Sequence, residues 1–124
     1  MKTQKEIRIP IDIYKAAVFV WICPADEAWK RYQEKGYFEK GETRAMFDYS
    51  RGKAIFQQGV NAIVWVESKG TRRDIIGGLT HEFLHIVFEM MLARGSYVHD
   101  SRNAEHYTYL LEYLMSETMK QYKI

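Results

Sequence analysis

The chain has 124 residues, of which 47% are apolar and 27% charged, and this balance predicts one compact domain rather than two domains or a disordered chain. Its formal net charge is only +2 and its basic residues are scattered, which argues against nucleic acid as the main partner. The longest apolar run, Ala16–Cys23, is too short to cross a bilayer, and one cysteine excludes an internal disulfide. We therefore expect a cytoplasmic domain with neither a nucleic-acid nor a membrane partner.

The first part of the chain predicts two strands. Isoleucine recurs at every second position, the period that buries one face of a strand, at Ile7, Ile9, Ile11 and Ile13. Pro10 cannot donate to a ladder, which indicates an edge strand or loose pairing. The next run, Ala16–Ile22, is apolar at every position, and this predicts a central strand that is covered on both faces.

A helix is predicted to follow the second strand. Pro24, Asp26 and Glu27 suit its first turn, because proline is tolerated there and acids favour the positive end of the helix dipole, and Gly36 indicates its end. Its inner face would consist of Ala28, Trp29 and Tyr32. This helix would cover one face of the sheet.

The middle of the chain predicts further strands. The runs Ala45–Tyr49 and Ala54–Phe56 flank Arg51 and Gly52, a pattern typical of a hairpin. Ala62–Val66 is another apolar run of strand length, and it ends at a turn. Either the hairpin or this run could supply an exposed strand for an extended partner.

Helical spacing takes over from about Arg72 to Arg94. Gly77 and Gly78 lie inside this span, and they either permit a close approach to the sheet or mark a helix that begins only at Leu79. A last helix is predicted from about Arg102 to Tyr122, with one apolar side made by Tyr107, Leu110, Leu111, Leu114 and Met115. Strands followed by long helices predict a single α+β domain over residues 1–124.

The first long helix contains the pattern H-E-x-x-H at His81, Glu82 and His85. Histidines four residues apart lie about one turn apart on one helix face, so both can reach the same ion. Glu82 is offset by about 100° from His81 and can act on a metal-activated water instead of binding the ion. The pattern predicts a Zn²⁺-dependent hydrolase with Glu82 as general base, and the alternative is a pair of ordinary helix histidines.

A catalytic zinc site needs a third protein ligand, and the sequence leaves it open. The candidates after His85 are, in order of preference, Glu105, His106 and His99. Tyr109 lies one turn beyond Glu105, where its hydroxyl could stabilise the oxyanion of a tetrahedral intermediate or could simply pack in the core.

The stretches Leu79–Glu89 and Asn103–Leu111 resemble the small zincin-type metallopeptidases of phages, prophages and other mobile elements. The resemblance implies a small mixed sheet followed by the H-E-x-x-H helix and a C-terminal helix. It also implies that His81, His85 and Glu105 bind zinc and that Glu82 is the base. A peptide bond in a protein or peptide substrate would then be hydrolysed.

The resemblance is to the gluzincin group and not to the metzincins, which would require glycine and histidine where the chain has Phe88 and Met91. The gluzincin pattern N-E-x-x-S-D around the third ligand is matched only by Glu105. The rival interpretation is a zinc-binding regulatory or interaction module without catalytic activity.

Overall fold

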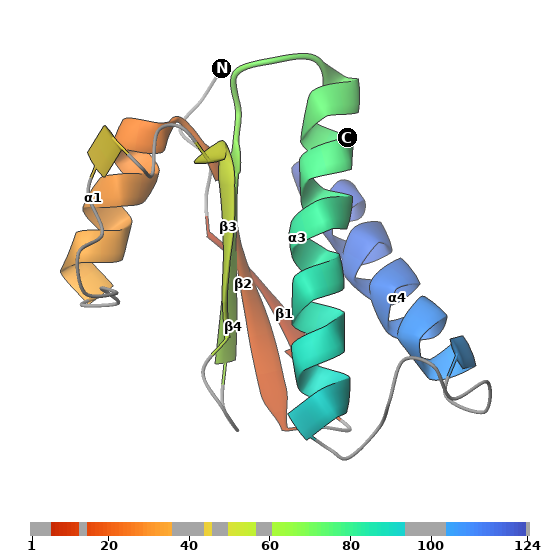
Figure 1. Ribbon diagram of the computed structural model, residues 1–124. Helices are drawn as coiled ribbons and strands as arrows, with labels where there is room; N and C mark the ends of the chain where they lie inside the picture. The colour runs from red at the N-terminus through yellow and green to blue at the C-terminus, as the bar shows by residue number, and fades with distance from the viewer. Residues whose placement is uncertain are drawn as a thin grey trace.

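The described residues form an α+β fold, as predicted, with a mixed sheet and the helices α1, α3 and α4 (Figure 1). The computed structural model describes residues 6–12, 15–35, 44–45, 50–56, 61–93 and 104–123. In chain order the elements are β1 (Ile7–Ile11), β2 (Ala16–Cys23), α1 (Ala25–Lys35), β3 (Gly52–Phe56), β4 (Asn61–Glu67), α3 (Arg72–Ala93) and α4 (Ala104–Tyr122). Helices α3 and α4 cover one face of the sheet and α1 lies on the other (Figure 1).

The strand order is β1-β2-β4-β3. The two inner strands, β2 and β4, are parallel, and each outer strand pairs antiparallel with its neighbour. The prediction of a buried central strand at 16–22 is confirmed, and β1 is an outer strand in which Pro10 lies opposite Ala17. Ile13 falls outside the described residues, as does Gly36 after α1.

Most of the first strand of the predicted hairpin lies outside the described residues, because the structure does not describe residues 46–49. Arg44 and Ala45 are helical. The second run belongs to strand β3, which pairs with β4 so that Ile55 lies opposite Ile63. β4, whose side chains are buried on both faces of the sheet, thus has a neighbouring strand on each edge.

Alternation along β2 and β4 divides the interior into two cores. One side carries the cluster of Val18, Val20, Ile22, Ala62, Val64 and Val66, which packs with the isoleucines of β1 and with α3 and α4. The other side carries Trp21, Cys23, Ile63 and Trp65, which pack with Ala28 and Tyr32 of α1. The inner face predicted for α1 is thus confirmed.

Helix α3 is continuous from Arg72, so the alternative start at Leu79 is wrong. Thr71 and Asp74 cap it reciprocally: the Thr71 N–H donates to Asp74 Oδ2 at 2.9 Å and the Asp74 N–H donates to Thr71 Oγ1 at 3.1 Å. By length and composition α3 could also cross a membrane, but its apolar side chains supply much of the larger core.

The two glycines of α3 differ in their surroundings. A Cβ on Gly78 would lie 2.8 Å from Cγ1 of Val66, whereas a Cβ on Gly77 would meet nothing within 4 Å. Gly78 therefore permits the close approach of α3 to β4, which is the first of the two explanations that the sequence offered.

Helix α4 is attached to the sheet by two tyrosine hydroxyls. The Tyr122 hydroxyl donates to the carbonyl oxygen of Val20 at 3.2 Å and accepts from the N–H of Ile22 at 3.3 Å. The Tyr113 hydroxyl donates to the carbonyl oxygen of Pro10 at 2.7 Å. These contacts anchor the second half of α4 to the backbone of β1 and β2.

Candidate metal centre

The histidine pair lies on the exposed side of α3. Leu79, Phe83 and Ile86 point into the larger core, and the helical period puts His81 and His85 on the opposite side. The Nε2 atoms of the two imidazoles are 3.2 Å apart and the rings meet edge to face at 78°. The ligand atoms are therefore already side by side and open to solvent.

This separation fits a shared ion. Two nitrogens that each lie about 2.05 Å from a tetrahedral Zn²⁺ are about 3.3 Å apart. The observed 3.2 Å between Nε2 of His81 and Nε2 of His85 agrees with that value. The same separation lets one ring donate an N–H to the other when the nitrogens are not shared by an ion.

Glu82 completes the group. A ligand atom of each of the three residues His81, Glu82 and His85 lies within 4.8 Å of the others. Glu82 is only 8% exposed although it carries a carboxylate. Burial raises the pKa of this carboxyl above its usual value, while the charges of His81, His85 and Lys53 act in the opposite direction.

A glycine on the neighbouring strand makes room for this carboxylate. A Cβ on Gly52 would lie 2.8 Å from Oε2 of Glu82 and 3.2 Å from the carbonyl oxygen of Trp65. Gly52 is the first residue of β3, the outer strand that lies beside α3. The sequence showed this glycine only as part of a turn, because its nearness to Glu82 depends on how β3 packs against α3.

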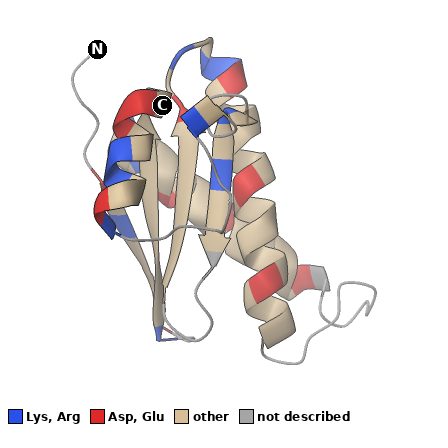
Figure 2. Ribbon diagram, turned by 60° about the vertical axis from the view of Figure 1, so that its left-hand side comes forward, with Lys and Arg blue, Asp and Glu red and all other residues tan. Residues whose placement is uncertain are grey.

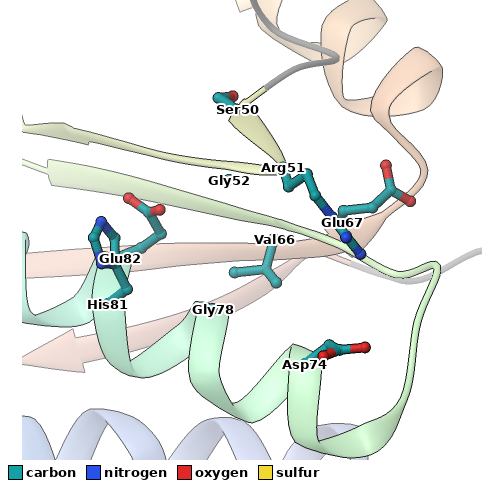
Figure 3. Close-up of a pocket in the computed structure, with 9 residues that line it drawn as sticks. All are labelled: Ser50, Arg51, Gly52, Val66, Glu67, Asp74, Gly78, His81 and Glu82. Carbon is teal, nitrogen blue, oxygen red and sulfur yellow. The ribbon is translucent and has the colours of Figure 1, made fainter.

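A cleft of about 350 Å³ opens from the group along the first half of α3 (Figure 3). It runs between α3 and the ends of β3 and β4, and its lining consists of Ser50, Arg51, Gly52, Val66, Glu67, Asp74, Gly78, His81 and Glu82. His81 and Glu82 lie at one end, and Arg51 and Asp74 lie at the other (Figure 3). The candidate centre thus adjoins a space large enough for part of a peptide.

No protein-family model matches the chain, and no curated protein or solved structure shows significant similarity to it. The spacing of His81, Glu82 and His85 on one helix, and the geometry it produces, are therefore the observations on which a functional argument can rest.

Glu105, the preferred third ligand, is an exposed residue of the first turn of α4 and is not part of the three-residue group. Tyr107 packs against Phe88 of α3, with ring centroids 5.9 Å apart. Positions two apart on a helix differ by about 200°, so Glu105 projects away from this contact. His99 lies outside the described residues.

Tyr109 lines a groove on another side of α4. It is 64% exposed and lines this groove of about 370 Å³ between β1 and α4 with Pro10, Ile11, Asp12, His106, Leu110 and Tyr113. Tyr109 follows Tyr107 by two positions, so it too points away from the side that meets α3. Tyr109 and His106 are thus among the residues that line this groove, whereas His81 and Glu82 line the cleft beside β3.

Proposed function

We propose that this protein is a zinc-dependent peptidase in which His81 and His85 bind Zn²⁺ and Glu82 is the general base. The observation that carries the proposal is the 3.2 Å separation of the two Nε2 atoms, with the Glu82 carboxylate in the same group. The gluzincin resemblance of the H-E-x-x-H helix supports it, and so does the adjoining cleft. A structural zinc would instead be enclosed by four ligands, whereas both histidines here are exposed.

Glu82 and Gly52 have different roles in the proposed reaction. A bound Zn²⁺ supplies Lewis acidity, which lowers the pKa of water and polarises a carbonyl group. Glu82 would accept the proton of the attacking water and later donate it to the leaving amine. Gly52 leaves the space in which the Glu82 carboxylate lies, so the position of the base depends on β3.

Strand β3 would also orient the substrate. It is the last strand in the sheet order and lies beside the helix that carries the histidines. An extended peptide could add to its outer edge through main-chain hydrogen bonds, which would fix a scissile amide next to Glu82. Of the two strands that the sequence left open for this role, we assign it to β3, because β4 has neighbours on both sides.

The third ligand in this proposal is Glu105, on the strength of the gluzincin resemblance and its 20-residue step from His85. Glu105 is exposed and lies outside the group of His81, Glu82 and His85, so in this proposal zinc binding has to bring its carboxylate to the histidines. Glu105→Gln should weaken zinc binding at least tenfold, because the loss of a residue that only supports a ligand already has an effect of this size. His106→Asn should leave zinc binding unchanged. Equal affinities for both variants and the unaltered chain would remove Glu105 from the ligand set.

The function is tested by metal content and hydrolysis measured on the same samples. The purified protein should take up one equivalent of zinc and cleave unfolded protein substrates, and a chelator should abolish cleavage. Glu82→Gln should keep the zinc and lose hydrolysis by at least a hundredfold, as expected for a lost general base. His81→Ala should lose both. If Glu82→Gln hydrolyses peptides at the original rate, the role of Glu82 is refuted.

A further inference from the structure

The end of the cleft farthest from the histidines is surrounded by positive charge. Arg51 lines the cleft, and the loop and first helical turn beside it carry Lys69, Arg72 and Arg73, all exposed. Figure 2 shows these basic segments together where the chain passes from β4 into α3. The positive end of the α3 dipole lies at the same place.

The Arg51 side chain is held in this position by the local backbone. Arg51 has a positive φ of 59°, and its Nη2 donates to the carbonyl oxygen of Lys69 at 3.0 Å. A Cβ on Gly70 would lie 3.3 Å from the same nitrogen, so glycine permits the approach. This hydrogen bond uses one of the five N–H donors of a guanidinium, which can also bind a carboxylate in a bidentate manner.

The two acids at this end of the cleft are bound by backbone N–H groups. Glu67 accepts from the N–H of Ala25 at 2.8 Å and from the N–H of Lys69 at 3.0 Å, and its carboxylate turns toward the start of α1 (Figure 3). Asp74 accepts from the N–H of Thr71 at 2.9 Å. Both carboxylates keep their negative charge, but the four cationic side chains of Arg51, Lys69, Arg72 and Arg73 outnumber these two acids, so this end of the cleft remains positive on balance.

The direction of β3 indicates which residues of a bound peptide would lie at this end of the cleft. β3 begins at Gly52, level with Glu82, and runs away from Arg51 toward Phe56. A peptide that pairs antiparallel with β3, the more stable arrangement, would run in the opposite direction. Its residues after the scissile bond would therefore extend toward Arg51.

We infer that the substrates are acidic peptides, with Asp or Glu within the first few residues on the C-terminal side of the cleaved bond, and that Arg51 binds one of these carboxylates. This inference rests on the proposed peptidase function and specifies its substrate class. Arg51 is a specificity-determining residue in this scheme, and Lys69, Arg72 and Arg73 add a less directional attraction.

The test compares cleavage of a peptide library by the unaltered chain and by three variants. Asp and Glu should be enriched after the cleaved bonds, and an Asp-containing peptide should exceed its Asn counterpart about tenfold in kcat/KM, mainly through KM. Arg51→Gln should bring that ratio near one, and Arg51→Glu should favour Lys at the same positions. Lys30→Gln, an exposed change on α1 across the sheet, is the control and should keep the ratio.

Equal ratios for the unaltered chain and Arg51→Gln would overturn the inference, as would equal cleavage of the Asp and Asn peptides, and both results would leave the peptidase proposal standing. If nothing is cleaved, the proposed function fails. Fluorescence anisotropy with the same labelled peptides then tests the charge preference of the cleft without cleavage. The Asp peptide should bind about tenfold more tightly than the Asn peptide, and this difference should decrease at high salt and disappear in Arg51→Gln. Tighter, Arg51-dependent binding of a single-stranded oligonucleotide would assign this surface to nucleic acid and refute the inference.

Discussion

Gly52 and Glu82 lie so close that a methyl group on the glycine would come within 2.8 Å of the carboxylate oxygen Oε2. The two residues belong to different elements, β3 and α3, and are 30 positions apart in the sequence (82 minus 52). The strand thereby sets the position of the candidate base. A change in β3 is expected to affect catalysis without touching either histidine.

The first prediction follows from this contact. Gly52→Ala should displace the Glu82 carboxylate and lower the rate of peptide hydrolysis by about 10- to 100-fold, because small errors in the position of a catalytic group are costly. Zinc content should not change, since both histidines are on the exposed side of α3. Hydrolysis and zinc stoichiometry are measured together, with Gly77→Ala as the control. An undiminished rate in a folded, zinc-loaded Gly52→Ala protein would contradict the assignment of Glu82 as base.

The second prediction concerns the packing of α3 on the sheet. Gly78→Ala should lower the free energy of unfolding by about 1–3 kcal/mol, because the added methyl group would overlap Val66. Gly77→Ala should raise it by up to about 1 kcal/mol, because alanine favours the helix and meets no neighbour. Denaturation curves of the two variants check this difference in sign. A stable Gly78→Ala protein would show that α3 and β4 are farther apart than described.

The third prediction tests the attachment of α4. Tyr122→Phe should cost about 1–3 kcal/mol of stability, because it removes the hydrogen-bonding partner of the Val20 carbonyl and the Ile22 N–H. Tyr113→Phe is the matched control. The Tyr113 hydroxyl also donates to a carbonyl oxygen, but Tyr113 is exposed and water can replace its hydroxyl, so the loss of stability should be smaller. Denaturant titration measures both. Equal losses would mean that Tyr122 contributes no more than a surface tyrosine.

The fourth prediction concerns alkaline pH. Burial raises the pKa of the Cys23 thiol from 9.0 to about 12 and that of the Tyr122 hydroxyl from 10.0 to about 12. The unfolded chain loses these protons at lower pH than the folded one, so the folded state binds more protons and stability must fall as pH rises. The contribution is complete below about pH 9 and is lost progressively toward pH 12.

Denaturation at a series of pH values from 8 upward measures this effect, with Cys23→Ala and Tyr122→Phe each expected to flatten the decline. A double variant that loses stability as steeply as the unaltered chain would assign the alkaline decline to other groups.

The histidine pair and most elements could be predicted because they depend on neighbours in the sequence. Alternation identified β1, uniform apolarity identified β2, and a four-residue spacing placed His81 and His85 together. These features follow from the periods of strands and helices. The role of Gly52 could not be predicted, because it depends on the packing of β3 against a helix that is distant in the sequence.

Helix α4 shows a second limit of prediction from sequence, which concerns which of its side chains face the core. The apolar side predicted for this helix contained Tyr107, Leu110 and Leu114, and these residues are buried as expected. Glu105 and Tyr109 each lie two positions from Tyr107, so the same period already pointed them away from the core side. Motif spacing suggested both residues as site residues, whereas the helical period directs them away from the side of α4 that carries Tyr107.

The cleft is built from one short stretch of the chain. The lining residues that the structure describes all lie between Ser50 and Glu82, a span that contains β3, β4 and the first half of α3. Contacts within this span join residues at most 32 positions apart (82 minus 50), whereas the hydrogen bonds of α4 with the sheet join residues about 100 positions apart, so the cleft closes the smaller loops. The shape of the cleft therefore depends mainly on how this one segment of the chain folds. We expect that insertions or substitutions in α1, β1 or the end of α4 change the free energy of unfolding but leave the geometry around the histidines unchanged.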